Sequence, residues 1–62
     1  MYYFIYCKGP NGKRFTLCNP RNGCRGMGKV YAPRFTKEQA DAVVVWMTDH
    51  NPGFVFQRRP AR

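Results

Sequence analysis

The side chains that most often carry catalysis are scarce in this chain of 62 residues. It has no serine, its one histidine is His50, and its three acidic residues fall between positions 38 and 49. A general acid and a general base must converge on one substrate. Asp41 and Asp49 instead stand eight positions apart on one expected helix, and no motif supports a cysteine and histidine nucleophile pair. We therefore predict that the protein is not an enzyme.

A metal site would have to use the cysteines and the histidine. Zinc prefers four soft or borderline ligands in a tetrahedral arrangement, often with two cysteines separated by two residues. Here the cysteines are spaced by eleven and six positions, so no such pair exists. We predict no metal and no cofactor, with small buried or incidental thiols and a polar histidine near a helix end. A Cys3His site would need Cys7, Cys18, Cys24 and His50.

A glycine-rich segment offers another type of site. Residues 23–29 match the G-x-x-x-x-G-K half of a phosphate-binding loop. Val30 stands where a serine or threonine must hold the metal, and Pro33 follows in place of a helix, which argues against nucleotide hydrolysis. Two interpretations remain. The segment is a plain loop, or its glycine amides hold one phosphate or carboxylate beside Arg25 and Lys29.

Charge is the strongest functional signal in the sequence. Eleven lysines and arginines against three acids give a net charge of +8. The basic residues form two groups, at positions 8–34 and 58–62, on either side of the acidic residues, apart from Lys37, which stands next to Glu38. A field of this sign attracts nucleic acid, anionic membrane or an acidic protein surface. The sequence predicts a single small basic domain over residues 1–62 that holds an acidic partner.

Ten aromatic residues accompany this charge. Each buries roughly 150–250 Å² when enclosed, so they supply much of the core that so short a chain can form. Aromatic rings interleaved with cations also suit single-stranded nucleic acid, because rings stack on bases while cations hold phosphates. This alternative nucleic-acid site consists of Tyr2, Phe4, Tyr6, Lys8, Lys13 and Arg14.

Two strands are expected at the start of the chain. Residues 2–7 form an aromatic and β-branched run, and residues 13–18 alternate Phe15 and Leu17 with polar neighbours. Asn11-Gly12 between them is typical of a type I′ turn, because both residues tolerate positive φ. We expect an antiparallel hairpin. Both alternating sets of the first strand are apolar, so it is either central and covered on both faces or leaves aromatic rings exposed.

A helix is expected after residue 36. Thr36 as N-cap and Gln39 form a capping box, and Phe35 before the cap can pack against Ala40. An apolar stripe at helical spacing follows, formed by Ala40, Val43, Val44 and Met47. The consecutive valines 43–45 also suit a strand, but the capping signals favour the helix.

The last strand completes the expected fold. Asn51-Pro52-Gly53 ends the helix, residues 54–58 predict a strand, and Pro60 stops the ladder. Residues 30–32 are a candidate short strand. The predicted fold class is α+β: a small antiparallel sheet, made of a β-hairpin and a C-terminal strand, packed against one α-helix in ββαβ order. A free edge on the last strand would permit a dimer.

No export or membrane signal is expected. The apolar opening at residues 1–7 lacks a basic start and is interrupted by Lys8, so it is too short for a signal peptide or a membrane span. We expect a cytoplasmic protein and no membrane partner. An odd number of cysteines at these spacings is a poor disulfide framework, and reduced cytosol does not favour one.

The second half of the chain carries a recognisable arrangement. Val30-Tyr31-Ala32 is followed by Glu38-Gln39-Ala40 leading to Trp46, then by Pro52-Gly53-Phe54 and Arg58-Arg59-Pro60. This arrangement resembles the phage-encoded inhibitor of bacterial RNA polymerase found in T-odd short-tailed phages. The resemblance is limited to this half, since residues 1–29 depart from the family.

The resemblance implies a function and a set of contacts. In that family, closely spaced arginines before a proline are implicated in gripping an acidic surface of the polymerase. We expect a non-enzymatic inhibitor in a bacterial host that blocks an acidic host protein, such as RNA polymerase, by charge-steered steric occlusion. The expected partner-binding residues are Arg58, Arg59, Arg62, Arg25, Lys29 and Arg34. The alternative is a nucleic-acid-binding module that uses the hairpin aromatics.

Overall fold

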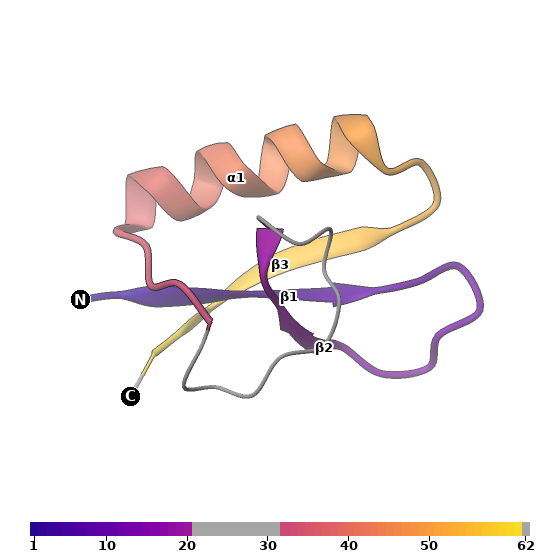
Figure 1. The fold of residues 1–62 in the computed structure, drawn as a ribbon, viewed down its shortest axis with the longest axis horizontal. Coiled ribbons are helices and arrows are strands. Elements are labelled where there is room, and N and C mark those ends of the chain that lie inside the picture. Colours follow the sequence, from indigo (N-terminus) through magenta and orange to yellow (C-terminus); the bar gives the residue numbers. More distant parts are fainter. Residues whose placement is uncertain (21–31, 62) are drawn as a thin grey trace.

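The computed structural model describes residues 1–20 and 32–61. It contains strand β1 (Tyr3–Lys8), strand β2 (Thr16–Cys18), helix α1 (Lys37–His50) and strand β3 (Val55–Pro60). The helix lies along one face of a three-stranded sheet (Figure 1). The predicted α+β class and ββαβ order are therefore confirmed. The candidate strand at residues 30–32 falls largely outside the described residues.

The sheet places its most apolar strand in the centre. The strand order is β2-β1-β3, and β1 pairs antiparallel with both neighbours. Ile5 is fully buried and Phe4 is 6% exposed, although the two side chains point to opposite faces of the sheet. A strand with apolar residues on both faces is best shielded from water when it lies between two other strands. This central position is one of the two that the sequence of β1 allowed.

The predicted type I′ turn is wrong. The N–H of Gly12 donates to the carbonyl of Gly9 (3.0 Å), which centres the turn on Pro10-Asn11. Proline favours this second position because its ring fixes φ near −65°. Among the described glycines only Gly53 has a positive φ, of 88°. The strands consequently meet later than expected, and β2 begins at Thr16 after a loop of residues 9–15.

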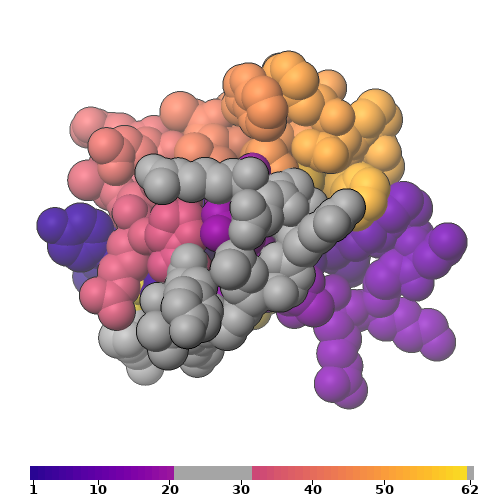
Figure 2. Space-filling view, viewed as in Figure 1, coloured from indigo at the N-terminus to yellow at the C-terminus, as the bar shows by residue number. Residues whose placement is uncertain are grey.

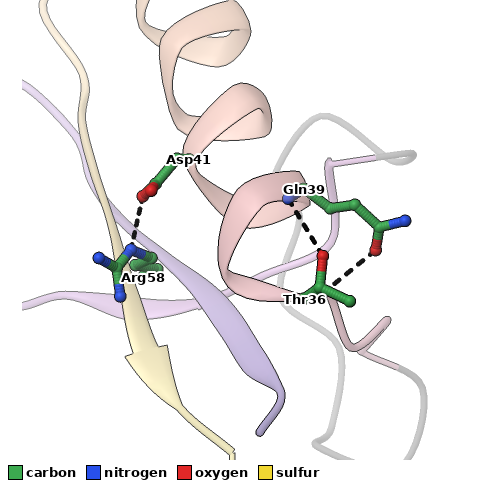
Figure 3. Close-up of polar contacts among 4 residues, drawn as sticks. All are labelled: Thr36, Gln39, Asp41 and Arg58. Atoms are coloured by element: carbon green, nitrogen blue, oxygen red, sulfur yellow. Dashed lines mark hydrogen bonds and ion pairs between the residues drawn. The ribbon is translucent and has the colours of Figure 1, made fainter.

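Helix α1 begins as its capping residues predict. Thr36 is the N-cap, and its hydroxyl accepts from the Gln39 N–H (3.3 Å) while the Gln39 side chain accepts from the Thr36 N–H (3.2 Å). Figure 3 shows both contacts. Phe35 packs against the core beside buried Ala40, as a residue before the cap should. The helix ends at His50, with Asn51 as its C-cap.

The core lies between α1 and the sheet. Its buried members come from all four elements and are Ile5, Cys7, Cys18, Ala40, Met47 and Phe56. Val43 and Val44 pack partly against them, which confirms the apolar stripe of the helix. Cys7 is a buried free thiol. Cys18 is disulfide-bonded, so the expectation against a disulfide is wrong; an odd cysteine count still allows one bond.

Strand β3 runs further than predicted and forms an edge of the sheet. It includes Pro60, which pairs with Tyr3. The backbone N–H and C=O of Tyr3 bond to Phe35 (2.8 and 2.9 Å), so they point away from β3. Tyr3 and Pro60 are thus a non-hydrogen-bonded pair, and the proline nitrogen faces the free edge, where no ladder donor is needed. Pro60 therefore fits inside the strand.

In the part of the chain that the structure describes, α1 is too short and too polar to cross a membrane.

The capping box yields a stability prediction. Thr36→Ala removes the side-chain acceptor of an exposed helix start, and we expect it to lower the free energy of unfolding by about 1 kcal/mol. Thr48→Ala is the matched control, because Thr48 is exposed within the same helix and bonds only to the Val44 carbonyl (2.7 Å). Urea denaturation followed by circular dichroism measures both variants. Equal losses in the two variants would contradict the role of the cap.

Candidate functional site

The alternation of side chains along β1 and β3 divides the basic residues between two faces. Ile5 opposes Arg58 and Cys7 opposes Phe56 on the face that α1 covers. The other face, called here the open face, carries the intervening residues. Its described members are Phe4, Tyr6 and Lys8 of β1, Leu17 of β2, and Val55, Gln57 and Arg59 of β3, together with Phe15, which directly precedes β2.

Cations lie on the aromatic rings of the open face. The Arg59 guanidinium carbon is 4.6 Å from the ring centre of Tyr6 and 5.4 Å from that of Phe15. The ammonium nitrogen of Lys8 is 5.1 Å from the same Phe15 ring. Each such contact at an exposed site contributes roughly 0.5–1 kcal/mol. The result is a layer in which two rings and two cations hold each other in place.

Gln57 fixes the orientation of Arg59. The two residues are separated by one position on β3, so their side chains leave the same face of the strand. In the amide orientation that satisfies both groups, the Gln57 oxygen accepts from Arg59 Nε (2.7 Å) and Nη2 (2.5 Å). This contact occupies one edge of the guanidinium group. The flat face of the group and its Nη1 atom remain unused by it.

No acidic side chain lies on the open face. All three acids of the chain, Glu38, Asp41 and Asp49, belong to α1 on the opposite side of the sheet. The described cations nearest to this face therefore act without a neutralising carboxylate beside them. A surface of one sign produces a stronger attraction for a partner of the other sign than a mixed surface does.

Arg58 has a different environment from its neighbour. Its Nε donates to Asp41 Oδ1 of α1 (2.5 Å; Figure 3). Its guanidinium carbon is also 4.7 Å from the ring centre of Tyr3. The hydrogen bond from Arg58 to Asp41 is the main cause of a pKa for Arg58 above its usual value. The side chain ties β3 to the helix. Arg58 and Arg59, expected to act together, therefore lie on opposite faces.

Several of the expected hairpin residues lie near the open face. Tyr2 is exposed and precedes β1, while Tyr6 is half-buried beneath Arg59. Phe4 is buried, and the Arg34 guanidinium carbon is 5.8 Å from its ring centre. The Phe4 ring is therefore closed to a stacking base.

Two further hairpin residues lie in the loop of residues 9–15. Lys13 and Arg14 are exposed there, and this loop extends away from the helix (Figure 2). The remaining expected contacts, Arg25, Lys29 and Arg62, lie outside the described residues, as does the glycine-rich segment.

Phe15 and Gln57 belong to the site but were not among the residues predicted for it. The signal for Gln57 is its spacing of two positions from Arg59 on a strand, which puts both on one face. The signal for Phe15 is the same spacing from Leu17. Neither spacing identifies the face that the helix leaves uncovered, because that depends on the pairing register with β1.

The outer side of α1 carries an exposed aromatic pair. Trp46 is 55% exposed, and its ring stacks on His50 with the ring centres 3.9 Å apart. The His50 Nδ1 atom lies 2.8 Å from the Trp46 carbonyl. Within the described residues, no group of three or more histidine, cysteine or acidic side chains is placed to hold a metal ion.

Comparisons of this chain with protein-family models, curated proteins and solved structures find no match.

The two arginine environments predict different energetic couplings to the helix. In a double-mutant cycle on the free energy of unfolding, Asp41→Asn and Arg58→Gln should show a favourable coupling that shrinks as salt concentration rises, because the pair is partly exposed. The matched cycle of Asp41→Asn with Arg59→Gln should show no coupling. Urea denaturation at low and high salt measures both. A coupling of Asp41 to Arg59 as large as to Arg58 would contradict the separation of the two faces.

Proposed function

We propose that this chain is a non-enzymatic binding protein that holds an acidic macromolecule against the open face of its sheet. The observation that carries this proposal is the separation of charge: Arg59 and Lys8 lie over rings on a face without acidic side chains, whereas Arg58 is bound to Asp41 on the other. A partner approaching the open face meets cations that no acidic side chain of this chain neutralises.

The charge distribution of the whole molecule also favours the approach of an acidic partner to the open face. A net charge of +8 attracts polyanions from a distance that the salt concentration limits to about 10 Å. The acidic residues of α1 weaken the field on the helix side. Lys13 and Arg14 in the adjoining loop strengthen it near Phe15. An acidic partner is therefore guided to the sheet side before any contact forms.

Arg59 and Lys8 also have a purely structural explanation, since long basic side chains often cover apolar surface with their stems. This explanation accounts for the covered rings. It does not account for the absence of acids, because one glutamate on this face would reduce the repulsion between the cations and stabilise the fold. Binding explains both features.

Inhibition of a host RNA polymerase, which the resemblance to the phage family implies, is the protein-binding form of this proposal. In that form an acidic polymerase surface would be occluded by the basic protein. The contact would have to reach Arg59 on the open face, because Arg58 is engaged with Asp41 beside the helix. A partner that required both arginines on one surface fits this geometry less well than a partner that contacts Arg59.

Charge reversal on each side of the sheet tests the proposal. Heparin serves as a polyanion that carries no bases. We expect Arg59→Glu to weaken heparin binding about tenfold more than Lys37→Glu does, because local charge on the binding face counts for more than net charge. Lys37 is the matched control: it is exposed at the start of α1, and its reversal changes the net charge equally.

The measurement is a titration of labelled heparin at two salt concentrations, with circular dichroism to check that both variants are folded. Equal losses in the two variants would mean that net charge alone drives binding, and the open face would not be the site. The expected loss should also shrink at high salt, because contacts between exposed charges are screened.

A further inference from the structure

We propose that the acidic partner of the open face is a single-stranded nucleic acid, one base of which stacks on the Arg59 guanidinium beside Tyr6 and Phe15. This inference rests on the proposed function, which supplies the electrostatic attraction. It adds a second recognition element, namely a flat surface for a base. A protein partner bound through carboxylates would have no use for that surface.

The contact between Gln57 and Arg59 argues against a carboxylate partner. Arginine recognises a carboxylate best with two parallel N–H donors, often from Nε and Nη2 on one edge. Gln57 already accepts from these two atoms at 2.7 and 2.5 Å. A carboxylate would have to displace Gln57 or bind end-on through Nη1 and Nη2. The plane of the guanidinium group and its Nη1 donor remain available. The plane suits a stacked base, and Nη1 suits one phosphate oxygen.

The ring layer below Arg59 provides a firm support for stacking. Arg59 is exposed and lies 4.6 Å from the ring centre of Tyr6, while Phe15 at 5.4 Å continues the layer sideways. Arginine planes and aromatic rings both stack on unpaired bases, and every base offers such a face whatever its sequence. Since Gln57 and the rings already hold the guanidinium, a base can stack on it with little loss of side-chain entropy.

Phosphate contacts are available next to this platform. Lys8 reaches over Phe15 from one side at 5.1 Å. Lys13 and Arg14 are exposed in the loop that leads into Phe15. A strand whose base stacks on Arg59 therefore carries its phosphates past cations on the neighbouring loop. This combination of stacking platform and basic border is the general design of proteins that bind single strands.

A double helix fits this protein less well. Sequence readout of duplex DNA generally inserts a helix or a β-ribbon into the major groove. The only described helix, α1, carries all three acidic residues of the chain and would bring them against phosphates. In a duplex the bases are already stacked on one another, so the Arg59 platform would remain unused. A single strand uses both the charge and the platform.

Charge-conserving variants separate stacking from attraction. Arg59→Lys keeps the charge but removes the flat guanidinium, and Phe15→Leu removes a ring without changing charge. We expect each to weaken binding of a mixed-sequence single-stranded DNA of about 12 nucleotides by roughly 5- to 100-fold, the usual effect of losing one stacking partner. Heparin binding should change by less than about twofold, because the net charge is unchanged.

The control for these variants is Lys37→Arg, which conserves charge at an exposed position of α1 away from the open face and should leave the affinity for both ligands within about twofold of the wild type. Fluorescence anisotropy of the labelled DNA, of the matching RNA, of a duplex of the same length and of poly-glutamate provides the comparison. The wild-type protein should bind the single strands most tightly. The ring-proton resonances of Tyr6 and Phe15 should shift upfield in NMR spectra when DNA is added.

Two outcomes overturn the inference and leave the proposed function standing. One is tighter binding of poly-glutamate or of the duplex than of the single strand. The other is an unchanged affinity for single strands in Arg59→Lys and Phe15→Leu while Arg59→Glu still weakens heparin binding. Should Phe15→Leu fail to fold, Arg59→Lys and the NMR shifts of the wild-type protein still decide the question. Failure of the proposed function is seen separately, as equal heparin losses in Arg59→Glu and Lys37→Glu.

Discussion

The central strand β1 has apolar side chains on both of its faces, and the other elements are arranged to cover them. One face, with Ile5 and Cys7, receives the helix, which contributes Ala40 and Met47. Among the described residues, the one helix lies on this face and none covers the second. Basic side chains lie over the rings there instead. The proposed binding surface is thus a consequence of how this short chain packs its central strand.

In this arrangement the same atoms serve the stability of the fold and the proposed binding. Arg59 covers part of Tyr6 and at the same time presents a charge to solvent. A hydrophobic residue in its place would cover the ring equally well and remove the charge. A glutamate would lose the favourable contact with the ring. The requirement for cover and the requirement for attraction therefore select the same residue type, and arginine satisfies both because its stem is apolar and its head is flat and charged.

The parts of the fold that depend on short segments of sequence were predictable. The capping box of Thr36 and Gln39 and the apolar stripe from Ala40 to Met47 follow from spacing alone. For β1, the sequence left a central position and exposed aromatic rings as alternatives. The turn at Gly9 to Gly12 was predicted in the wrong register, because Asn11-Gly12 is a strong local signal but Pro10 competes with it one position earlier. The disulfide of Cys18 depends on chain geometry that no spacing rule supplies.

The candidate site was predictable in its residue types but not in its arrangement. Basic and aromatic residues near the hairpin were expected to cooperate, and Tyr6 and Lys8 do lie on the same face of β1. The separation of Arg58 from Arg59 follows directly from strand alternation once residues 58 and 59 are known to be in a strand. Which of the two arginines points toward the helix depends on the pairing register of β3 with β1. The burial of Phe4 likewise depends on tertiary neighbours such as Arg34.

The free edge of β3 has a consequence for how several molecules can share one partner. Pro60 offers no N–H at this edge, and Arg58 and Arg59 precede it. If two copies joined their sheets along β3, they would lose a ladder bond and bring the arginines of both chains together. A long polyanion can screen that repulsion but cannot restore the missing donor. Copies bound along one polyanion would therefore lie next to each other as separate units, and each could dissociate without its neighbour.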